Sequence, residues 1–117
     1  MTVRHSYRPT ASLLAKLAGK PVLLDYYADW CTDCVRMEKS TFADAEVRTE
    51  LMNRFVRLQV DVSDTGDPES KAIKARFDVY GPPATLFFSS TGEEIKGLRT
   101  YGFLDKPTLL GMLRRVN

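Results

Sequence analysis

The spacing of hydrophobic positions changes several times along the chain, and each spacing predicts a different element. Residues 22–28 are apolar almost without a break, which is typical of a central strand covered on both faces. Residues 55–62 alternate in part and predict a second strand, and the apolar run over 85–88 predicts a third. Weak alternation over residues 2–8 favours an edge strand. The sequence therefore predicts a β-sheet with a buried centre.

Between these strands the apolar residues recur at helical spacing, and turn residues separate the segments. We predict helices over residues 10–19, 31–40, 44–53, 68–77 and 107–115. Residues 63–68 have the composition of a loop, and residues 89–92 predict a hairpin to a returning strand over 94–101. Helical crossovers require parallel strands, whereas the hairpin requires an antiparallel pair. Together they predict an α/β fold with a mixed central β-sheet flanked by helices on both faces.

Composition agrees with one domain spanning residues 1–117 and excludes several functions. The 117 residues are 44% hydrophobic and 27% charged, as in an ordinary soluble domain, which excludes two separate domains. The net charge of +2 gives no strong electrostatic field of the kind that binds nucleic acid, so we expect no nucleic-acid partner. As an isolated domain we expect the chain to be a monomer. No apolar segment follows the first charged residues, so we expect no signal peptide. The protein is then cytoplasmic or a domain of a longer chain.

The motif Cys31-Thr32-Asp33-Cys34 carries the candidate chemistry. It directly follows a buried strand and opens a helix, and a Cys-x-x-Cys pair in this position predicts a redox-active disulfide. Free backbone N–H groups and the helix dipole favour a thiolate there. Two alternatives compete. A structural staple across so short a loop gives little stabilisation, and a zinc site needs about two further ligands, whereas His5 is the only histidine.

Two acidic residues accompany the cysteines. Asp25 interrupts the apolar strand, and an ionised, unpaired carboxylate there costs several kcal/mol, which predicts a raised pKa. Its functional interpretation is a proton acceptor for Cys34, and its structural one is a buried polar group satisfied by a neighbour. Glu38 follows Cys34 by one helical turn and shares its face. The alternative for Glu38 is an exposed carboxylate near a basic side chain.

Two further segments complete the candidate site. Trp30 precedes the cysteines and either covers the disulfide or packs in the core. Gly81-Pro82-Pro83-Ala84 leads into a strand, where a cis X-Pro bond is plausible and a rigid all-trans turn is the alternative.

The run Tyr27-Ala28-Asp29-Trp30-Cys31-Thr32-Asp33-Cys34 and its continuation Glu38-Lys39-Ser40-Thr41-Phe42 resemble a known family. With Val79-Tyr80-Gly81-Pro82-Pro83 and Leu86-Phe87-Phe88, they make the chain similar to thioredoxin-fold proteins. More closely, it resembles the C-terminal periplasmic domain of the DsbD family, which are bacterial inner-membrane thiol:disulfide interchange proteins. The similarity runs from about Gly19 to the C-terminus.

The resemblance implies a thioredoxin fold and a protein-disulfide reductase that acts as an electron relay. Its donor is the transmembrane domain of the same polypeptide, and its acceptor is the N-terminal periplasmic domain, which supports disulfide isomerisation and cytochrome c maturation. It implies no cofactor or metal beyond the redox-active Cys31–Cys34 disulfide. Cys31 matches the attacking cysteine and Cys34 the resolving one. Pro83 matches the cis-proline.

The remaining expectations concern tuning and binding. Asp25 and Glu38 match acidic residues beside the family's active site, and with Asp33 they disfavour the thiolate, which favours a reductant. We expect Trp30, Thr32, Asp33, Pro82 and Pro83 to form the substrate-binding surface. Pro82 departs from the family because it lacks a backbone N–H, so partner binding should lose one donor.

Two other functions stay open from the sequence. The chain is alternatively a free-standing thioredoxin-like protein-disulfide reductase, or a non-enzymatic binding module in which the cysteine pair is only structural.

Overall fold

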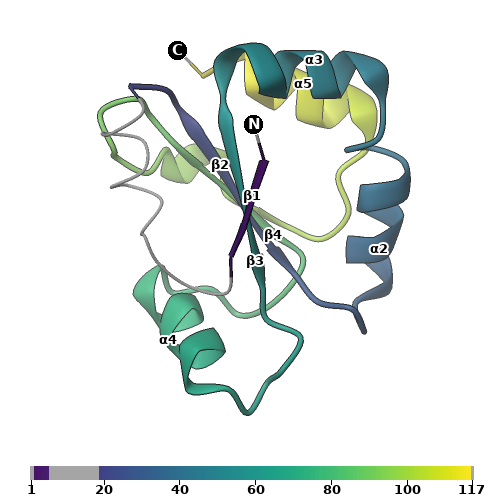
Figure 1. Ribbon diagram of the computed structural model, residues 1–117. Helices are drawn as coiled ribbons and strands as arrows, with labels where there is room; N and C mark the ends of the chain where they lie inside the picture. Colours follow the sequence, from purple (N-terminus) through teal and green to yellow (C-terminus); the bar gives the residue numbers. More distant parts are fainter. Residues whose placement is uncertain (1, 6–18, 117) are drawn as a thin grey trace.

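A mixed β-sheet forms the centre of the computed structural model, which describes residues 2–5 and 19–116 (Figure 1). In these residues five strands lie in the order β1 (Thr2–His5), β3 (Val56–Asp61), β2 (Val22–Tyr27), β4 (Ala84–Phe88) and β5 (Thr100–Tyr101). Strands β1 and β2 run parallel to β3, whereas β4 runs antiparallel to both β2 and β5. The predicted mixed sheet is confirmed.

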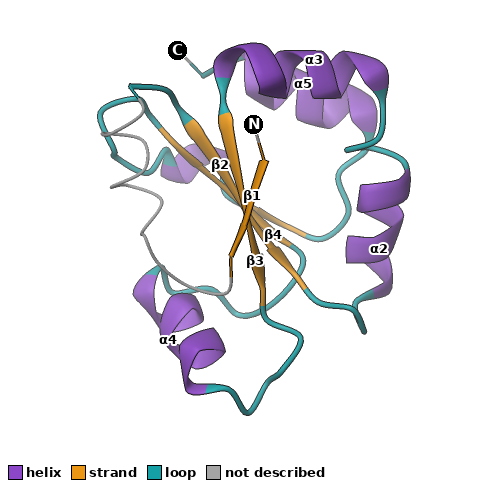
Figure 2. Ribbon diagram, in the orientation of Figure 1, coloured by secondary structure: helices purple, strands orange, loops and turns teal. Residues whose placement is uncertain are grey.

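Helices cover both faces of this sheet, as the sequence predicts (Figure 2). One face carries α4 (Pro68–Arg76), and the other carries α2 (Thr32–Lys39), α3 (Ala45–Arg54) and α5 (Lys106–Arg114). None of the helices in the described part of the chain is long and apolar enough to cross a membrane. The helix predicted over residues 10–19 and the end of the strand predicted over 2–8 lie almost wholly outside the described residues.

Local sequence explains where these helices begin. Asp44 accepts hydrogen bonds from the backbone N–H groups of Glu46 and Val47 and so caps α3. Asp67 caps α4, whose first residue is a proline that needs no N–H partner there. Asp105 caps α5 in the same way. Each start is therefore fixed by a short-range contact.

The two faces of the sheet pack against separate hydrophobic clusters. On the α4 face, the cluster joins the three central strands to Ile73 of α4. On the opposite face, Leu23 and Phe87 of the sheet pack against α2, α3 and α5, with Phe55 and Phe87 edge to face at 6.3 Å. Side chains alternate between these faces along each strand, so neighbouring residues of β2 serve different clusters. This alternation decides which residues can reach the cysteines.

The strand predicted over residues 94–101 is wrong in its middle. Glu94 forms a single bridge with Phe88, a 3-10 helix η1 (Lys96–Leu98) follows, and only β5 resumes pairing with β4. A continuous ladder from that bridge would bring Thr85 opposite residue 97, yet Thr85 pairs with Thr100. The turn of η1 takes up these extra residues. The predicted hairpin turn itself is present, with Gly92 at φ 94°.

Candidate active site

The two cysteines lie at the junction between β2 and α2. Cys31 is the N-cap of α2, and its Sγ accepts a hydrogen bond from the backbone N–H of Cys34 at 3.2 Å. The two residues are joined by a disulfide, which is the predicted pair. Only 7% of Cys31 and 4% of Cys34 is exposed. The same N–H group and helix N-terminus can stabilise a thiolate at Cys31 after reduction.

Cys34 is the sulfur that faces the protein interior. Its Sγ lies 3.9 Å from the carbonyl oxygen of Tyr26, to which a reduced thiol can donate. A small cavity with room for about one water molecule reaches Cys34, Asp25, Glu38 and Pro83. A proton leaving Cys34 thus has carboxylates close by, whereas Cys31 lies at the helix start.

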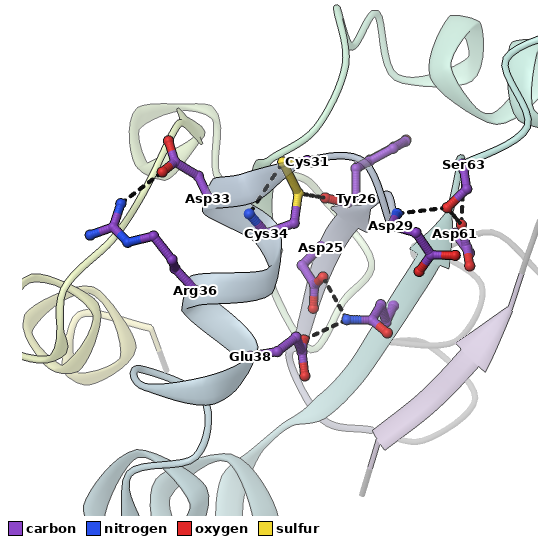
Figure 3. Close-up of a disulfide and its surroundings, with 11 residues drawn as sticks. Asp25, Tyr26, Asp29, Cys31, Asp33, Cys34, Arg36, Glu38, Asp61 and Ser63 are labelled. Carbon is purple, nitrogen blue, oxygen red and sulfur yellow. Dashed lines mark hydrogen bonds and ion pairs between the residues drawn. A yellow bond between two sulfur atoms is a disulfide. The ribbon is translucent and has the colours of Figure 1, made fainter.

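Asp25 is buried beneath the disulfide, where the sequence places it. It is 5% exposed, and burial raises the pKa of its carboxyl group, with Glu38 adding to the rise and Arg57 opposing it. The predicted raised pKa is therefore confirmed in direction. Figure 3 shows Asp25 and Glu38 on the same side of α2, facing β3.

Arg57 joins the two carboxylates. Its Nε–H donates to Asp25 Oδ2 at 2.8 Å, and its Nη2–H donates to Glu38. The guanidinium also lies over the ring of Phe42, 3.7 Å from its centroid. Burial acts to lower the pKa of Arg57, but the two acids outweigh burial and raise it. The structure therefore places a buried cation where the sequence analysis expected only acids.

Gln59 completes this group of side chains. Its Nε2 amide donates to Asp25 Oδ1 at 3.3 Å and to Glu38 Oε1 at 2.5 Å, so one amide reaches both acids. Gln59 Oε1 has no hydrogen-bond partner among the described residues. We call Asp25, Glu38, Arg57 and Gln59 the buried polar cluster.

Sequence reasoning missed Arg57 and Gln59. Both alternate with the apolar positions of the strand predicted over 55–62, and such alternation predicts a solvated face. In the structure that face lies under α2, and the parallel register sets Gln59 opposite Asp25. The alternation is present, but both side chains are buried. The sequence did contain one signal, because a carboxylate within a buried strand, as at Asp25, needs a polar or charged partner that is buried with it.

Trp30 lies on the surface beside the disulfide. It is 57% exposed, and its Nε1–H donates to the carbonyl of Ser63 at 2.8 Å. Ser63 Oγ also accepts from the backbone N–H of Asp29 at 2.8 Å, and Asp61 accepts from the Ser63 N–H and hydroxyl. The loop after β3 therefore holds the residues before Cys31, as Figure 3 shows.

Thr32 and Asp33 lie between the cysteines at the outer side of α2. Thr32 is exposed, and Asp33 accepts a hydrogen bond from Arg36 at 2.8 Å one turn later. Arg36 in turn lies over the ring of Phe103 at 4.1 Å. Figure 3 places this ion pair on the opposite side of α2 from Asp25. The charge of Asp33 is thus partly offset.

The Pro82–Pro83 peptide bond is cis, as the sequence suggests. Both prolines are half-buried, and Pro83 lines the cavity beside Cys34. Next to them Tyr80 is 89% exposed, and its ring lies 5.0 Å from that of Tyr101 on β5. Pro83 therefore lies beside Cys34 on the β4 side of the sheet.

The side chains around the cysteines do not form a metal site. Within residues 2–5 and 19–116, no group of three or more His, Cys, Asp or Glu side chains is placed to hold a metal ion.

Comparison with known proteins defines the class of this domain. The profile of the thioredoxin-like domain matches residues 9–117. A thioredoxin from Thermus thermophilus has a TM-score of 0.77 and 27% identity, covering 98% of this chain and 87% of that one. The chain therefore belongs to the thioredoxin-like family, and the predicted thioredoxin fold is confirmed.

Within that class, the chain is similar to one group in particular. The C-terminal domain of Neisseria meningitidis DsbD, in its reduced form, has a TM-score of 0.74 and 28% identity, covering 92% of this chain and 90% of that one. The thiol:disulfide interchange protein DsbD of Ralstonia nicotianae is 46% identical over 101 residues, which is 86% of this chain but only 16% of that protein. The predicted resemblance to the DsbD family is therefore confirmed, although the chain spans only a small part of the length of the curated relatives it matches.

Proposed function

We propose that this chain is the electron-relaying domain of a longer thiol:disulfide interchange protein and acts as a protein-disulfide reductant. The observation that carries the proposal is the Cys31–Cys34 disulfide at the start of α2, next to the buried carboxylate of Asp25 and the half-buried one of Glu38. The similarity to DsbD over a small part of that protein's length supports the longer chain. In this proposal the membrane-embedded part of the same polypeptide donates electrons, and a periplasmic domain accepts them.

The exchange proceeds in two steps. In the first, the Cys31 thiolate attacks one sulfur of a partner disulfide, so a mixed disulfide forms and the partner's other sulfur leaves as a thiolate. In the second, Cys34 loses its proton to Asp25 and its sulfur attacks Cys31 Sγ. The partner then leaves as a dithiol, reduced by two electrons, and the Cys31–Cys34 disulfide is restored.

The charges beneath the cysteines favour the reductant direction. The buried polar cluster contains two carboxylates and one guanidinium, so a negative excess faces the sulfurs. Negative charge nearby disfavours a thiolate, and a dithiol whose thiolate is poorly stabilised is readily oxidised. Because Arg57 and Arg36 offset part of this charge, the effect is smaller than the acids alone suggest.

In this proposal the partner binds across the exposed and half-buried residues around the disulfide. Trp30, Thr32 and Asp33 offer one side of this surface, and Pro82 and Pro83 offer the other. Pro82 can accept a main-chain hydrogen bond from a bound segment but cannot donate one. The domain then acts in the periplasm, and the electrons support disulfide isomerisation and cytochrome c maturation.

Trapping of mixed disulfides tests the order of the two cysteines. We expect Cys34→Ser to accumulate a mixed disulfide with an oxidised partner domain, because the second attack is lost. Cys31→Ser should give no exchange and no trapped complex. Non-reducing electrophoresis and mass spectrometry give the yields. Equal trapping through Cys34 in the Cys31→Ser variant would contradict the assignment, and no exchange by the unaltered domain would contradict the function.

A further inference from the structure

The connection between α4 and β4 carries part of the proposed partner-binding surface. Residues 78–83, which we call the docking loop, end at the cis Pro82–Pro83 bond, and Pro83 lines the cavity beside Cys34. Tyr80 in the same loop is 89% exposed. Large exposed aromatic side chains are typical of surfaces that bind other proteins. The contacts that hold this loop therefore decide how a partner meets the cysteines.

The docking loop begins with an unusual backbone conformation. Asp78 has a φ of 57° and is the only non-glycine residue with a positive φ in the described part of the chain. Its N–H donates to the Ala75 carbonyl at 3.2 Å, and the Val79 N–H donates to the Lys74 carbonyl at 2.8 Å, which ends α4. Glycine is the usual residue at such a position, because a side chain there is strained. Since Asp78 has left the helical geometry, its carbonyl can accept from groups outside α4.

Arg99 is the main partner of that carbonyl. Its Nη1–H donates to Asp78 O at 3.1 Å, and the Tyr101 hydroxyl adds a longer contact at 3.5 Å. The same guanidinium donates from Nε to Glu94 Oε2 at 2.8 Å and from Nη2 to Glu94 Oε1 at 2.7 Å. A pair with two such hydrogen bonds fixes the plane of the guanidinium. Glu94 therefore directs the remaining nitrogen of Arg99 toward the docking loop.

The ion pair between Glu94 and Arg99 is shielded from solvent. Only 10% of the Glu94 side chain and 20% of the Arg99 side chain is exposed. Exposed pairs gain little because they are solvated and mobile, whereas a shielded pair with two hydrogen bonds can hold a fixed geometry. The two residues lie on either side of η1, the turn that interrupts the predicted strand. The insertion of η1 therefore accompanies an ion pair that reaches Asp78.

The middle and the end of the docking loop are held from the same region of the chain. The Gly102 N–H donates to the Pro83 carbonyl at 2.9 Å. The ring of Tyr101 lies 5.0 Å from that of Tyr80. Arg99, Tyr101 and Gly102 thus contact the loop at its start, middle and end, and of these only Arg99 does so through a charged side chain.

We infer that Arg99 is a positioning residue for partner binding: its contact with Asp78, directed by Glu94, holds the docking loop where a partner protein meets the cysteines. This inference rests on the proposed function. Arg99 does not line the cavity beside Cys34, so it acts on binding through the loop and not on the exchange of electrons. Loss of the contact should weaken binding of a partner more than it slows the chemistry of the cysteines.

Amide hydrogen exchange tests the position of the loop in the folded domain. In Arg99→Met we expect the Val79 and Gly102 amides to exchange at least about tenfold faster, because the loop loses a hydrogen bond from a charged donor. The Val56 amide, which donates to Pro21 at 2.9 Å beside the central sheet, is the reference for the stability of the whole fold. A role in overall stability alone would speed all three amides alike.

Single-turnover reduction of insulin tests the binding of a protein disulfide. The reduced domain is mixed with increasing concentrations of insulin, and the remaining thiols of the domain are counted after acid quenching. In Arg99→Met the insulin concentration that gives half the limiting rate should rise about tenfold, whereas the limiting rate should change much less. With glutathione attached to Cys31, its release by Cys34 requires no bound protein. This release should slow far less than the reaction with insulin.

Three further variants sharpen the test. Arg99→Lys keeps the charge, but one ammonium group cannot pair with Glu94 at two points and also reach Asp78, so intermediate effects are expected. Glu94→Gln removes the charge that directs Arg99 and should act in the same direction as Arg99→Met, with a smaller size. Arg114→Met removes an exposed ion pair with Glu46 between α5 and α3. It is the matched control and should leave both measurements unchanged.

The outcomes separate this inference from the proposed function. Unchanged exchange of the Val79 and Gly102 amides in folded Arg99→Met would overturn the role of Arg99. Equal slowing of insulin reduction and glutathione release would overturn it as well. If Arg99→Met does not fold, Glu94→Gln decides by the same criteria. If the unaltered domain reduces no insulin, the proposed function fails, and the hydrogen exchange still decides whether Arg99 holds the loop.

Discussion

The two faces of the central sheet have the same backbone and opposite chemistry. Facing α4, β2 places Val22, Leu24 and Tyr26 against apolar residues of β3 and β4, and all are buried. Facing α2, the same strand places Asp25 opposite Gln59, with Arg57 next to them. One face therefore serves stability, whereas the other carries polar groups that a stable core does not need.

The polar face is tolerated because its groups satisfy one another. Asp25 accepts from Arg57 and Gln59, and Glu38 accepts from the same two side chains. Burying such groups without partners costs several kcal/mol, so the network is a condition for placing acids under the disulfide. Farther along this face, Leu23 and Phe87 restore an apolar core under α3 and α5.

The largest expected effect on stability lies on the apolar face. Leu24 is completely buried, and Leu24→Ala should lower the free energy of unfolding by about 2–5 kcal/mol through lost burial and a cavity. Urea unfolding of the oxidised protein measures it. Release of glutathione from Cys31 by the folded fraction should be unchanged. If Leu24→Ala lowers the free energy of unfolding by less than about 1 kcal/mol, or slows the release of glutathione, the two faces do not have separate roles in stability and exchange.

Asp25→Asn tests the polar face. An amide cannot accept the Cys34 proton, so release of glutathione from Cys31 should slow by about 100-fold, at the lower end of general-base effects. Stopped-flow measurement of the released thiol gives the rate. Asp64→Asn, which changes an exposed loop carboxylate in the same way, is the control and should retain the full rate. Equal rates in Asp25→Asn and the unaltered domain would exclude Asp25 as the acceptor.

The raised pKa of Asp25 gives a pH signature in stability. Because its pKa in the folded protein lies above the ordinary value of 3.8, the folded state binds this proton more tightly than the unfolded state. The resulting stabilisation is complete below that ordinary value and is lost as pH rises through the folded-state pKa.

In Asp25→Asn the side chain does not titrate, so this pH-dependent loss of stability is absent. Its stability relative to the unaltered domain should improve across that pH window, by about 1.4 kcal/mol for every tenfold difference between the proton affinities of the folded and unfolded states. Urea unfolding at a series of pH values measures the difference, and Leu24→Ala should show a constant offset instead. A difference that stays constant with pH for Asp25→Asn would show that its pKa is not raised.

The smallest effect belongs to the exposed ion pair at the cysteines. The side chains of Arg36 and Asp33 are 57% and 43% exposed, and exposed pairs contribute little. Arg36→Met should change the free energy of unfolding by no more than about 1 kcal/mol. Thermal and urea unfolding measure it beside Arg57→Met. A larger loss from Arg36→Met than from Arg57→Met would reverse the contrast between exposed and buried pairs.

Two of the four residues of the buried polar cluster could be predicted from the sequence. Asp25 breaks an apolar run, and Glu38 follows Cys34 by one helical turn, so local spacing predicts both. Arg57 and Gln59 fit the alternation of their strand, and nothing in the nearby sequence marks them as buried. Their role depends on the parallel register that sets Gln59 beside Asp25, and on α2 covering that face. Both are contacts between elements that lie far apart in the sequence.

The strand predicted over residues 94–101 failed for a related reason. Its turn chemistry is local and correct, since Gly92 closes the hairpin beyond Phe88. The insertion of η1 depends on where β5 finds its partners on β4, which is a property of the whole sheet. Local signals therefore predicted the elements and the cysteine pair, whereas contacts between elements decided the pairing and the buried cation.

A redox titration tests the central claim, that the domain is a reversible dithiol reductant, most directly. The oxidised domain is equilibrated with graded ratios of reduced and oxidised dithiothreitol or glutathione, and thiols at Cys31 and Cys34 are counted after acid quenching. We expect full reversibility with a midpoint nearer to the about −270 mV of thioredoxin than to the about −120 mV of a strong disulfide oxidant. A disulfide that does not interconvert, or a midpoint close to that of the oxidant, would contradict the account.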